Sequence, residues 1–272
     1  NVDGLTGFVK TTERGRVTGT ISDPEELLAD TSVVVAFSNE YAQYWSKLGS
    51  VGRTFTSPYM KPGTYKMTVF KKQLAVATAS VTIETGATAT SDVEVTYVEN
   101  ASPIWRIGAW DGTPDGFMNS DKIHMMHPSD KRMSSWKSVT FEAGKDLAME
   151  FPMALFRGVN DPTTISFTLT EAQASAARTL QIGVTLAQGS ARPSVSVNDK
   201  WTGPVPTSAA VKTRGVTRGS TTGNYMNYKF TIPATALLTG SNSIALTISS
   251  GTTDPAENFL HAAVVFDALE LS

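Results

Sequence analysis

The side chains in this sequence that are best suited to chemistry are aromatic rings, whose faces can stack on the apolar faces of sugars. Five tryptophans are present, namely Trp45, Trp105, Trp110, Trp136 and Trp201. Trp105 lies in an apolar run and is expected in the core, since tryptophan is mostly buried. Trp110 and Trp201 lie in turn-rich segments. We therefore predict that Trp110 and Trp201, together with Tyr225, form carbohydrate-binding positions.

Two further patterns suggest metal ligands. Asp267 lies inside the apolar run 262–271, where a buried carboxylate needs a partner. A structural Ca²⁺ ion is one candidate partner, and an arginine or a set of backbone N–H groups is the alternative. His124 and His127 have the i, i+3 spacing that would let them share a metal on a helix. However, they precede Pro128 in a predicted loop without an obvious third ligand, so ordinary histidine roles are the alternative.

No motif in the sequence assembles a catalytic centre. The chain lacks cysteine, a Gly-x-Ser-x-Gly elbow and the glycine-rich loops that bind nucleotides. No pair among the 25 acidic residues has a spacing that demands glycosidase chemistry. A net charge of -2 and the lack of a long apolar run argue against nucleic-acid and membrane partners. We therefore predict no catalytic residue within these 272 residues.

The elements that must position these residues are predicted to be almost entirely β-strands. Thr, Val, Gly and Pro are frequent, and short alternating segments recur about every ten residues, as in a β-sandwich. We predict a linker over 1–14, a small fibronectin III-like or transthyretin-like sandwich over 15–98, and a jelly roll over 99–272. Short helices are expected over 24–30, with Asp23 as the N-cap, and over 171–177. The predicted strands of the second domain are 138–141, 147–151, 164–169, 179–187, 194–197, 228–232, 243–248 and 264–271.

The second domain also carries segments that point to a known family. The run Ile104 to Asn119 closely resembles the start of the last domain of rhamnogalacturonan lyases of polysaccharide lyase family 4. The segments 127–136, 214–219 and 266–271 fit the same domain. The stretch 15–98, including Pro62-Gly63-Thr64-Tyr65, resembles the family's fibronectin III-like middle domain. The resemblance covers nearly the whole chain.

This resemblance implies a secreted, extracellular parent enzyme that cleaves rhamnogalacturonan I of pectin by β-elimination. In the family, the catalytic base lies in an N-terminal domain that has no counterpart here, so no catalytic residue transfers to this sequence. The resemblance implies accessory domains whose partners are that catalytic domain and the pectic polysaccharide. A free-standing carbohydrate-binding protein and a purely structural role are the alternatives. The opening Asn1-Val2-Asp3-Gly4 is expected to follow a part of the protein that this chain lacks.

Overall fold

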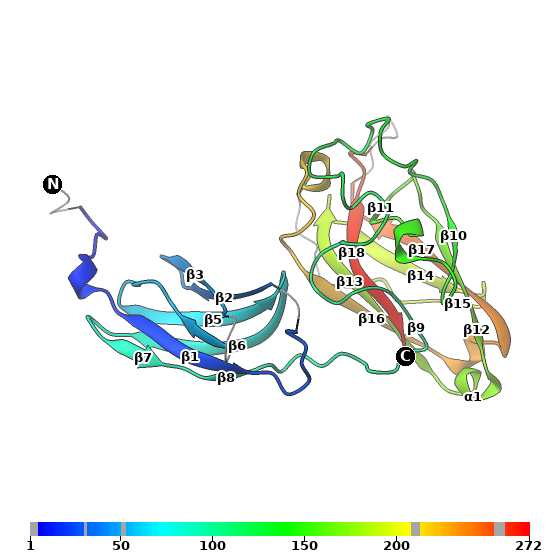
Figure 1. Cartoon of the computed structure of the whole chain (residues 1–272). Coiled ribbons are helices and arrows are strands. Elements are labelled where there is room, and N and C mark those ends of the chain that lie inside the picture. The colour runs from blue at the N-terminus through cyan, green and yellow to red at the C-terminus, as the bar shows by residue number, and fades with distance from the viewer. Residues whose placement is uncertain (1–4, 30–31, 50–52, 208–212, 253–258) are drawn as a thin grey trace. The chain divides into compact units, whose positions relative to one another are not determined.

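The computed structural model describes the chain except for residues 1–4, 30–31, 50–52, 208–212 and 253–258. It divides into two compact units, Asn1–Glu99 and Asn100–Ser272 (Figure 1). The division lies one residue from the predicted boundary. Residues 5–14, predicted to be a linker, belong to the first unit and include a short 3₁₀ helix, η1 (Thr11–Glu13).

The first unit is a β-sandwich of two four-stranded sheets. One sheet contains β4 (Thr54–Thr56), β1 (Arg16–Ser22), β7 (Thr88–Thr90) and β8 (Val93–Glu94). The other has the order β3 (Gln43–Lys47), β2 (Val33–Ser38), β5 (Gly63–Lys71) and β6 (Leu74–Ile83). Alternation buries Val35, Phe37 and Met67 between the two sheets. The strands β3, β4 and β7 were not predicted.

The helix predicted over 24–30 is absent from 24–29, and residue 30 lies outside the described residues. Residues 24–29 form turns, and Glu26 adopts a positive φ of 54° that an α-helix excludes. The Asp23 carboxylate nevertheless accepts hydrogen bonds from the backbone N–H groups of Leu27 and Leu28 at 3.0 and 2.9 Å. The prediction of Asp23 as a helix N-cap is therefore wrong, because an N-cap side chain accepts from the second or third residue after it, whereas Asp23 bonds the fourth and fifth residues after it, in a turn.

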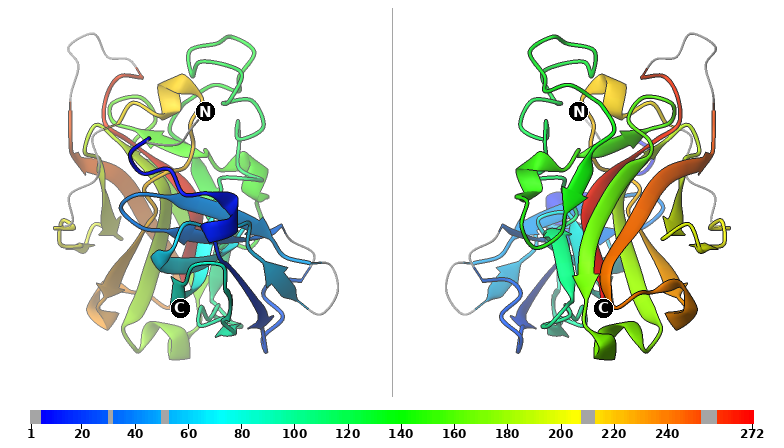
Figure 2. Two further views of the ribbon diagram at one scale, coloured as in Figure 1. Left: turned by 90° about the vertical axis from the view of Figure 1, so that its left-hand side faces the viewer. Right: turned by 90° about the vertical axis from the view of Figure 1, so that its right-hand side faces the viewer.

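The second unit packs two five-stranded sheets face to face (Figure 2). One sheet has the order β10 (Thr140–Glu142), β12 (Thr163–Leu169), β17 (Gly240–Ser250), β14 (Arg192–Val197) and β15 (Trp201–Thr202). The other has the order β11 (Ala154–Phe156), β18 (Ala263–Leu271), β13 (Arg178–Gln188) and β16 (Met226–Ile232), with β9 (Trp105–Gly108) paired to β18. Four short helices lie between the strands: η2 (Ala148–Glu150), α1 (Glu171–Ala174), η3 (Val216–Arg218) and η4 (Ala234–Ala236).

Aromatic side chains fill the space between the sheets of the second unit. Phe151 contacts Phe141 and Phe266 with ring centroids 5.3 and 5.7 Å apart, both in edge-on geometry. Strand β18 is buried along its whole length, because loops cover the side of it that faces away from this core. The segment 147–151, predicted to be a strand, is the 3₁₀ turn η2 instead, and the predicted all-β architecture is otherwise confirmed.

Candidate functional site

Asp267 is fully buried at the centre of β18, on the side opposite the sandwich core. One of its carboxylate oxygens, Oδ1, accepts hydrogen bonds from the backbone N–H groups of Asp111 and Gly112 at 3.1 and 2.8 Å. These two residues belong to a loop 155 or more positions earlier in the chain. The carboxylate therefore holds this loop against the outer side of the sheet.

The Asp-Gly pair in this loop is shaped for that contact. The Asp111 carboxylate turns back to accept from the backbone N–H and the hydroxyl of Thr113, at 2.9 and 2.6 Å. Gly112 adopts a φ of 78°, a left-handed conformation that glycine reaches without steric cost. The Asp111–Thr113 contact is an Asx-turn, and the backbone it shapes presents the N–H groups of Asp111 and Gly112 to Asp267.

Trp110, which precedes the turn, is folded beneath the same loop. Only 3% of its surface is exposed, and its indole N–H donates to Glu270 Oε2 at 3.0 Å. Glu270 is also buried and is neutralised by Arg106, whose Nε lies 2.8 Å from Oε2. The prediction of Trp110 as a sugar-stacking position is therefore wrong, because both its ring and its polar atom are engaged within the protein.

Gly183 of β13 makes room for the indole. A Cβ atom at position 183 would lie 2.5 Å from Trp110 Cζ3 and 3.0 Å from the Asp267 Cβ. The β13–β18 pairing also shifts register at this point, between the pairs Ile182–Leu269 and Val184–Phe266. This irregularity places Asp267 and Glu270, three residues apart, on the same outer side of the sheet.

Tyr225 lies near enough to Asp267 for its hydroxyl group to lower the pKa of that carboxylate, while the residue remains partly exposed. The second carboxylate oxygen, Oδ2, is buried and makes no hydrogen bond of ordinary geometry within the described residues. Burial raises the pKa of Asp267 to about 6, against the opposing effects of the Asp111 and Gly112 N–H groups and the Tyr225 hydroxyl. The nearby Asp111 charge raises this pKa further. Three of the predicted residues, Trp110, Tyr225 and Asp267, thus meet in one buried polar cluster, in which Asp267 Oδ2 and Glu270 Oε1 make no hydrogen bond of ordinary geometry within the described residues.

Hydrogen bonds from the loop occupy one of the two Asp267 oxygens that a calcium ion would use, and calcium binding stays a prediction. Calcium takes six to eight oxygen ligands, whereas Oδ1 of Asp267 meets two N–H donors, and only Oδ2 makes no hydrogen bond of ordinary geometry within the described residues. Nowhere in the described ranges do three His, Asp or Glu side chains gather as metal ligands. The alternative derived from the sequence, a set of backbone N–H groups, is the arrangement found.

Trp201 lies apart from this cluster, on the edge strand β15 of the other sheet. Its side chain is partly exposed and packs along one edge of the hydrophobic core. A Cβ atom at the neighbouring Gly203 would lie within 3.0 Å of both the Trp201 ring and Phe230. Trp201 is therefore anchored on one side and open on the other, which is the geometry a stacking platform needs.

His124 and His127 lie beside a surface hollow of about 190 Å³ that Thr217 and Arg218 also line. His127 Nδ1 accepts the backbone N–H of Ser129 at 3.2 Å and lies 2.8 Å from its hydroxyl oxygen. The structure thus brings the two histidines to one place, but adds an arginine where a metal site would need a further ligand. These groups suit an anion better than a cation.

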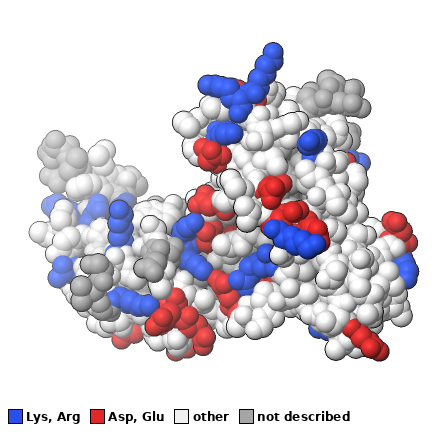
Figure 3. Space-filling view, turned by 45° about the vertical axis from the view of Figure 1, so that its right-hand side comes forward, with Lys and Arg blue, Asp and Glu red and all other residues white. Residues whose placement is uncertain are grey.

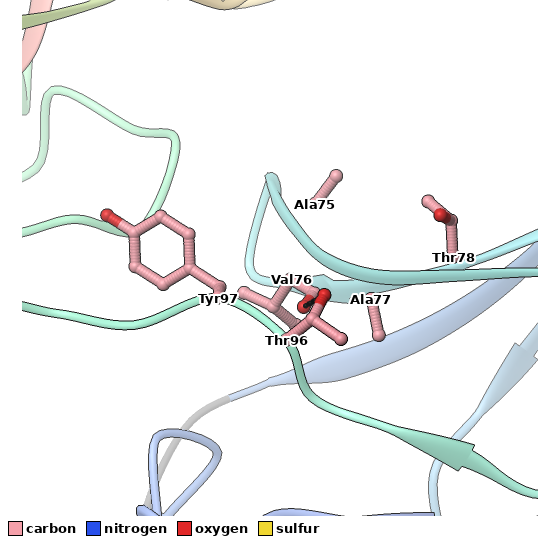
Figure 4. Close-up of a pocket in the computed structure, with 6 residues that line it drawn as sticks. All are labelled: Ala75, Val76, Ala77, Thr78, Thr96 and Tyr97. Carbon is pink, nitrogen blue, oxygen red and sulfur yellow. Dashed lines mark hydrogen bonds between the residues drawn. The ribbon is translucent and has the colours of Figure 1, made fainter.

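A second hollow, of about 250 Å³, lies in the first unit at the free edge of β6 (Figure 4). Its floor is fixed by the backbone N–H groups of Thr96 and Tyr97, which both donate to the Val76 carbonyl at 3.1 Å. Small neutral side chains line it, and the Tyr97 ring points away from them (Figure 4). No charged side chain lines this hollow, so it offers little with which to select a ligand.

Trp45 is a candidate binding residue that was not predicted from the sequence. It is the most exposed tryptophan in the described residues, at 57%, and stands on β3 within Gln43-Tyr44-Trp45-Ser46-Lys47. A signal was present, because alternation in a strand puts Trp45 on the same face as the polar residues Gln43 and Lys47. The segment was not recognised as a strand, so this signal was not used.

Surface charge is mixed rather than concentrated. On the face drawn in Figure 3, Lys and Arg side chains alternate with Asp and Glu over both units. Several exposed basic groups are paired, as Arg132 is with Asp130 at 2.7 Å. Among the described helices, none is long and apolar enough to cross a membrane.

Comparison with known proteins identifies the family of this chain. Residues 13–91 match the model of polysaccharide lyase family 4, domain II, and residues 103–271 match that of the same family's domain III, described as carbohydrate-binding-module-like. The chain therefore belongs to polysaccharide lyase family 4, of which it contains the second and third domains.

The relatives are fungal enzymes. The chain is 44% identical over 271 residues to rhamnogalacturonate lyase A of Emericella nidulans, covering 98% of this chain and 49% of that protein. It is 42% identical over 270 residues to rhamnogalacturonate lyase A of Aspergillus aculeatus, with the same two coverages. The chain thus spans about half the length of these relatives. A solved family 35 carbohydrate-binding module overlaps 41% of the chain at 22% identity and a TM-score of 0.26, which is too weak to inform function.

Proposed function

We propose that this chain is the accessory part of a secreted rhamnogalacturonan endolyase that cleaves rhamnogalacturonan I of pectin by β-elimination. The observation that carries the proposal is the match to domains II and III of one lyase family, over about half the length of the relatives. On this view, the base that removes the proton α to the uronate carboxylate belongs to a catalytic domain outside these residues. The chain's own task is to hold the polysaccharide near that domain.

The second unit supplies the groups for that task in this proposal. The open side of Trp201 would stack on a sugar ring, and the hollow beside Arg218 would receive a uronate carboxylate. The Asp267 cluster acts indirectly, because it fixes the loop after β9 rather than contacting ligand. Calcium has no part in this proposal.

Mixing the chain with rhamnogalacturonan I tests both halves of the proposal. The absorbance of unsaturated uronate product should stay flat with the chain alone and rise when the parent enzyme is added. Affinity electrophoresis through gels containing the polysaccharide should retard the chain, and Trp201→Ala should reduce that retardation. A steady rise in absorbance from the chain alone would show that a catalytic centre exists within it. A chain that migrates unretarded would leave only a structural role.

A further inference from the structure

The first unit presents a flat outer face that the proposed function does not use. This face belongs to the sheet β3-β2-β5-β6. Side chains of one parity in these strands, such as Val35, Phe37 and Met67, are buried in the sandwich. Side chains of the other parity must therefore point outward, since successive residues of a strand face opposite sides.

Strand register arranges the outward residues in rows, because paired residues of adjacent strands lie side by side. One row runs across the sheet through Trp45, Ala36, Thr68 and Thr78. Ala36 and Thr68 in this row are each only 7% exposed, so its accessible residues are Trp45 and Thr78. The rows on either side are Lys47, Val34, Phe70 and Ala75, and Gln43, Ser38, Lys66 and Ser80. We call these three rows the outer grid.

Trp45 is the main apolar feature of the outer grid. Its ring centroid lies 6.3 Å from that of Phe70, with the two planes inclined by 38°. This contact supports one edge of the indole, while more than half of the residue remains in solvent. A supported but exposed indole offers a stacking surface that loses little conformational entropy on binding.

The charges of the outer grid have one sign. Lys47 and Lys66 are both exposed, and none of the outward positions in these four strands holds Asp or Glu. Lys47 lies two residues along β3 from Trp45, roughly 7 Å away, and Lys66 lies two strands across and one row along, roughly 12 Å away. The other positions carry mostly hydroxyl, amide or methyl groups.

From this arrangement we infer that the outer grid is a second polysaccharide-binding face, for a chain of sugars that carries carboxylates. A sugar ring stacks on Trp45, while neighbouring carboxylates reach Lys47 and Lys66. The mixture of one indole, two lysines and short polar groups does not resemble a protein interface, whose buried centre is depleted in lysine. This inference rests on the proposed function in one respect, namely the choice of an acidic sugar as the ligand. The outer grid shares no residue with Trp201 or with the hollow beside Arg218.

Titration of the whole chain with an oligogalacturonate tests this inference. Trp45→Ala should weaken binding roughly tenfold, the loss expected of a central aromatic contact. Lys66→Gln, a surface change that leaves the core intact, should weaken it roughly threefold. The matched controls are Tyr41→Ala, which removes an 87% exposed ring outside the outer grid, and Lys137→Gln, which removes an exposed charge in the second unit. Both controls should bind like the unmodified chain.

The contribution of the sugar carboxylates to binding can be measured separately. Binding should weaken as salt is added, because salt screens exposed charges. The methyl ester of the oligogalacturonate, which keeps the sugar rings and loses the carboxylates, should bind the unmodified chain and Lys66→Gln equally weakly. Amide chemical shifts of β3 and β5 should move on titration with the acidic oligomer.

Two results would overturn the inference. Unchanged affinity in both Trp45→Ala and Lys66→Gln would place the acidic ligand elsewhere, and would leave the proposed function standing if Trp201→Ala still reduced binding. The second such result is sedimentation in which the unmodified chain self-associates and Trp45→Ala abolishes this association with no loss of sugar affinity. The outer grid would then be a protein interface. Failure of the proposed function is separate, since it would appear as product formed by the chain alone.

Discussion

Trp45 in the first unit and Trp110 in the second show how differently two tryptophans are used. Trp45 stands on a regular strand and is 57% exposed, whereas Trp110 follows a strand in a turn-rich loop and is 3% exposed. The loop position of Trp110 does not expose it, because Asp267 draws the following turn onto the sheet. Exposure is therefore decided by what holds the backbone, rather than by whether the residue lies in a strand or a loop.

The largest test of this comparison is the pair Trp110→Ala and Trp45→Ala. Removing the Trp110 ring leaves a cavity and takes a donor from buried Glu270, so the second unit should lose about 3–5 kcal/mol of unfolding free energy. Trp45→Ala should cost the first unit less than about 1 kcal/mol, as for surface changes. Hydrogen exchange of peptides from β18 and β5 against urea reports each unit separately.

The comparison would fail if the β5 peptides of Trp45→Ala lost protection as extensively as the β18 peptides of Trp110→Ala. Trp45 would then be a structural residue of its unit, and the outer grid would lose its main argument. Intact protection of β18 in Trp110→Ala would instead show that the loop after β9 is held by Asp267 alone.

The second test concerns pH and the charge of Asp267. Its pKa is raised from 3.8 to about 6, so the folded chain holds this proton more tightly than the unfolded chain does. The free energy of unfolding should therefore fall as the pH rises from about 4 to about 6, by up to ~3 kcal/mol for this group. Asp267→Asn, which keeps an oxygen for the N–H groups of the loop, should remove that slope. Urea unfolding at several pH values measures it.

Asp92 in the first unit provides a control, because its pKa is shifted in the opposite direction to that of Asp267. Hydrogen bonds from the hydroxyl and backbone N–H of Thr20 lower its pKa, so its stabilising effect is lost as the pH falls through that lowered pKa. Asp92→Asn should therefore leave the pH 4 to 6 slope of the second unit unchanged. An unaltered slope in Asp267→Asn would show that another group of the second unit titrates in this range.

The sequence predicts the fold well where the alternation of apolar and polar residues agrees with the positions of turn residues. It predicts the functional residues less well. The two-sandwich architecture and the short helix at Glu171 follow from strand periodicity and local turn chemistry. Asp267 was recognised because a carboxylate in an apolar run requires a partner, and one of the alternatives proved right. Glu270 and Arg106 were not recognised, since their pairing joins positions 164 residues apart and depends on a register shift that no local pattern encodes.

The third test is Trp201→Ala. Trp201 is less exposed than Trp45 and more exposed than Trp110, so it extends the comparison between those two residues. Its ring packs partly against the core, so its loss should cost the second unit about 1–2 kcal/mol. It should also weaken retention by rhamnogalacturonan I, unlike Trp110→Phe, which keeps a buried ring. A Trp201→Ala chain with unchanged retention would move the binding surface of the second unit away from β15.

The smallest expected effect is that of calcium. Because Oδ1 of Asp267 meets two backbone N–H groups, neither a chelator nor added calcium should shift the melting temperature of the chain by more than about 1 °C. Scanning calorimetry with and without the chelator measures this, and Asp267→Asn should behave in the same way as the unmodified chain. A calcium-dependent rise that disappears in Asp267→Asn would mean that the ion displaces the loop amides. In that event, the turn at Asp111 would be held by metal rather than by hydrogen bonds, and the burial of Trp110 beneath it would depend on the ion.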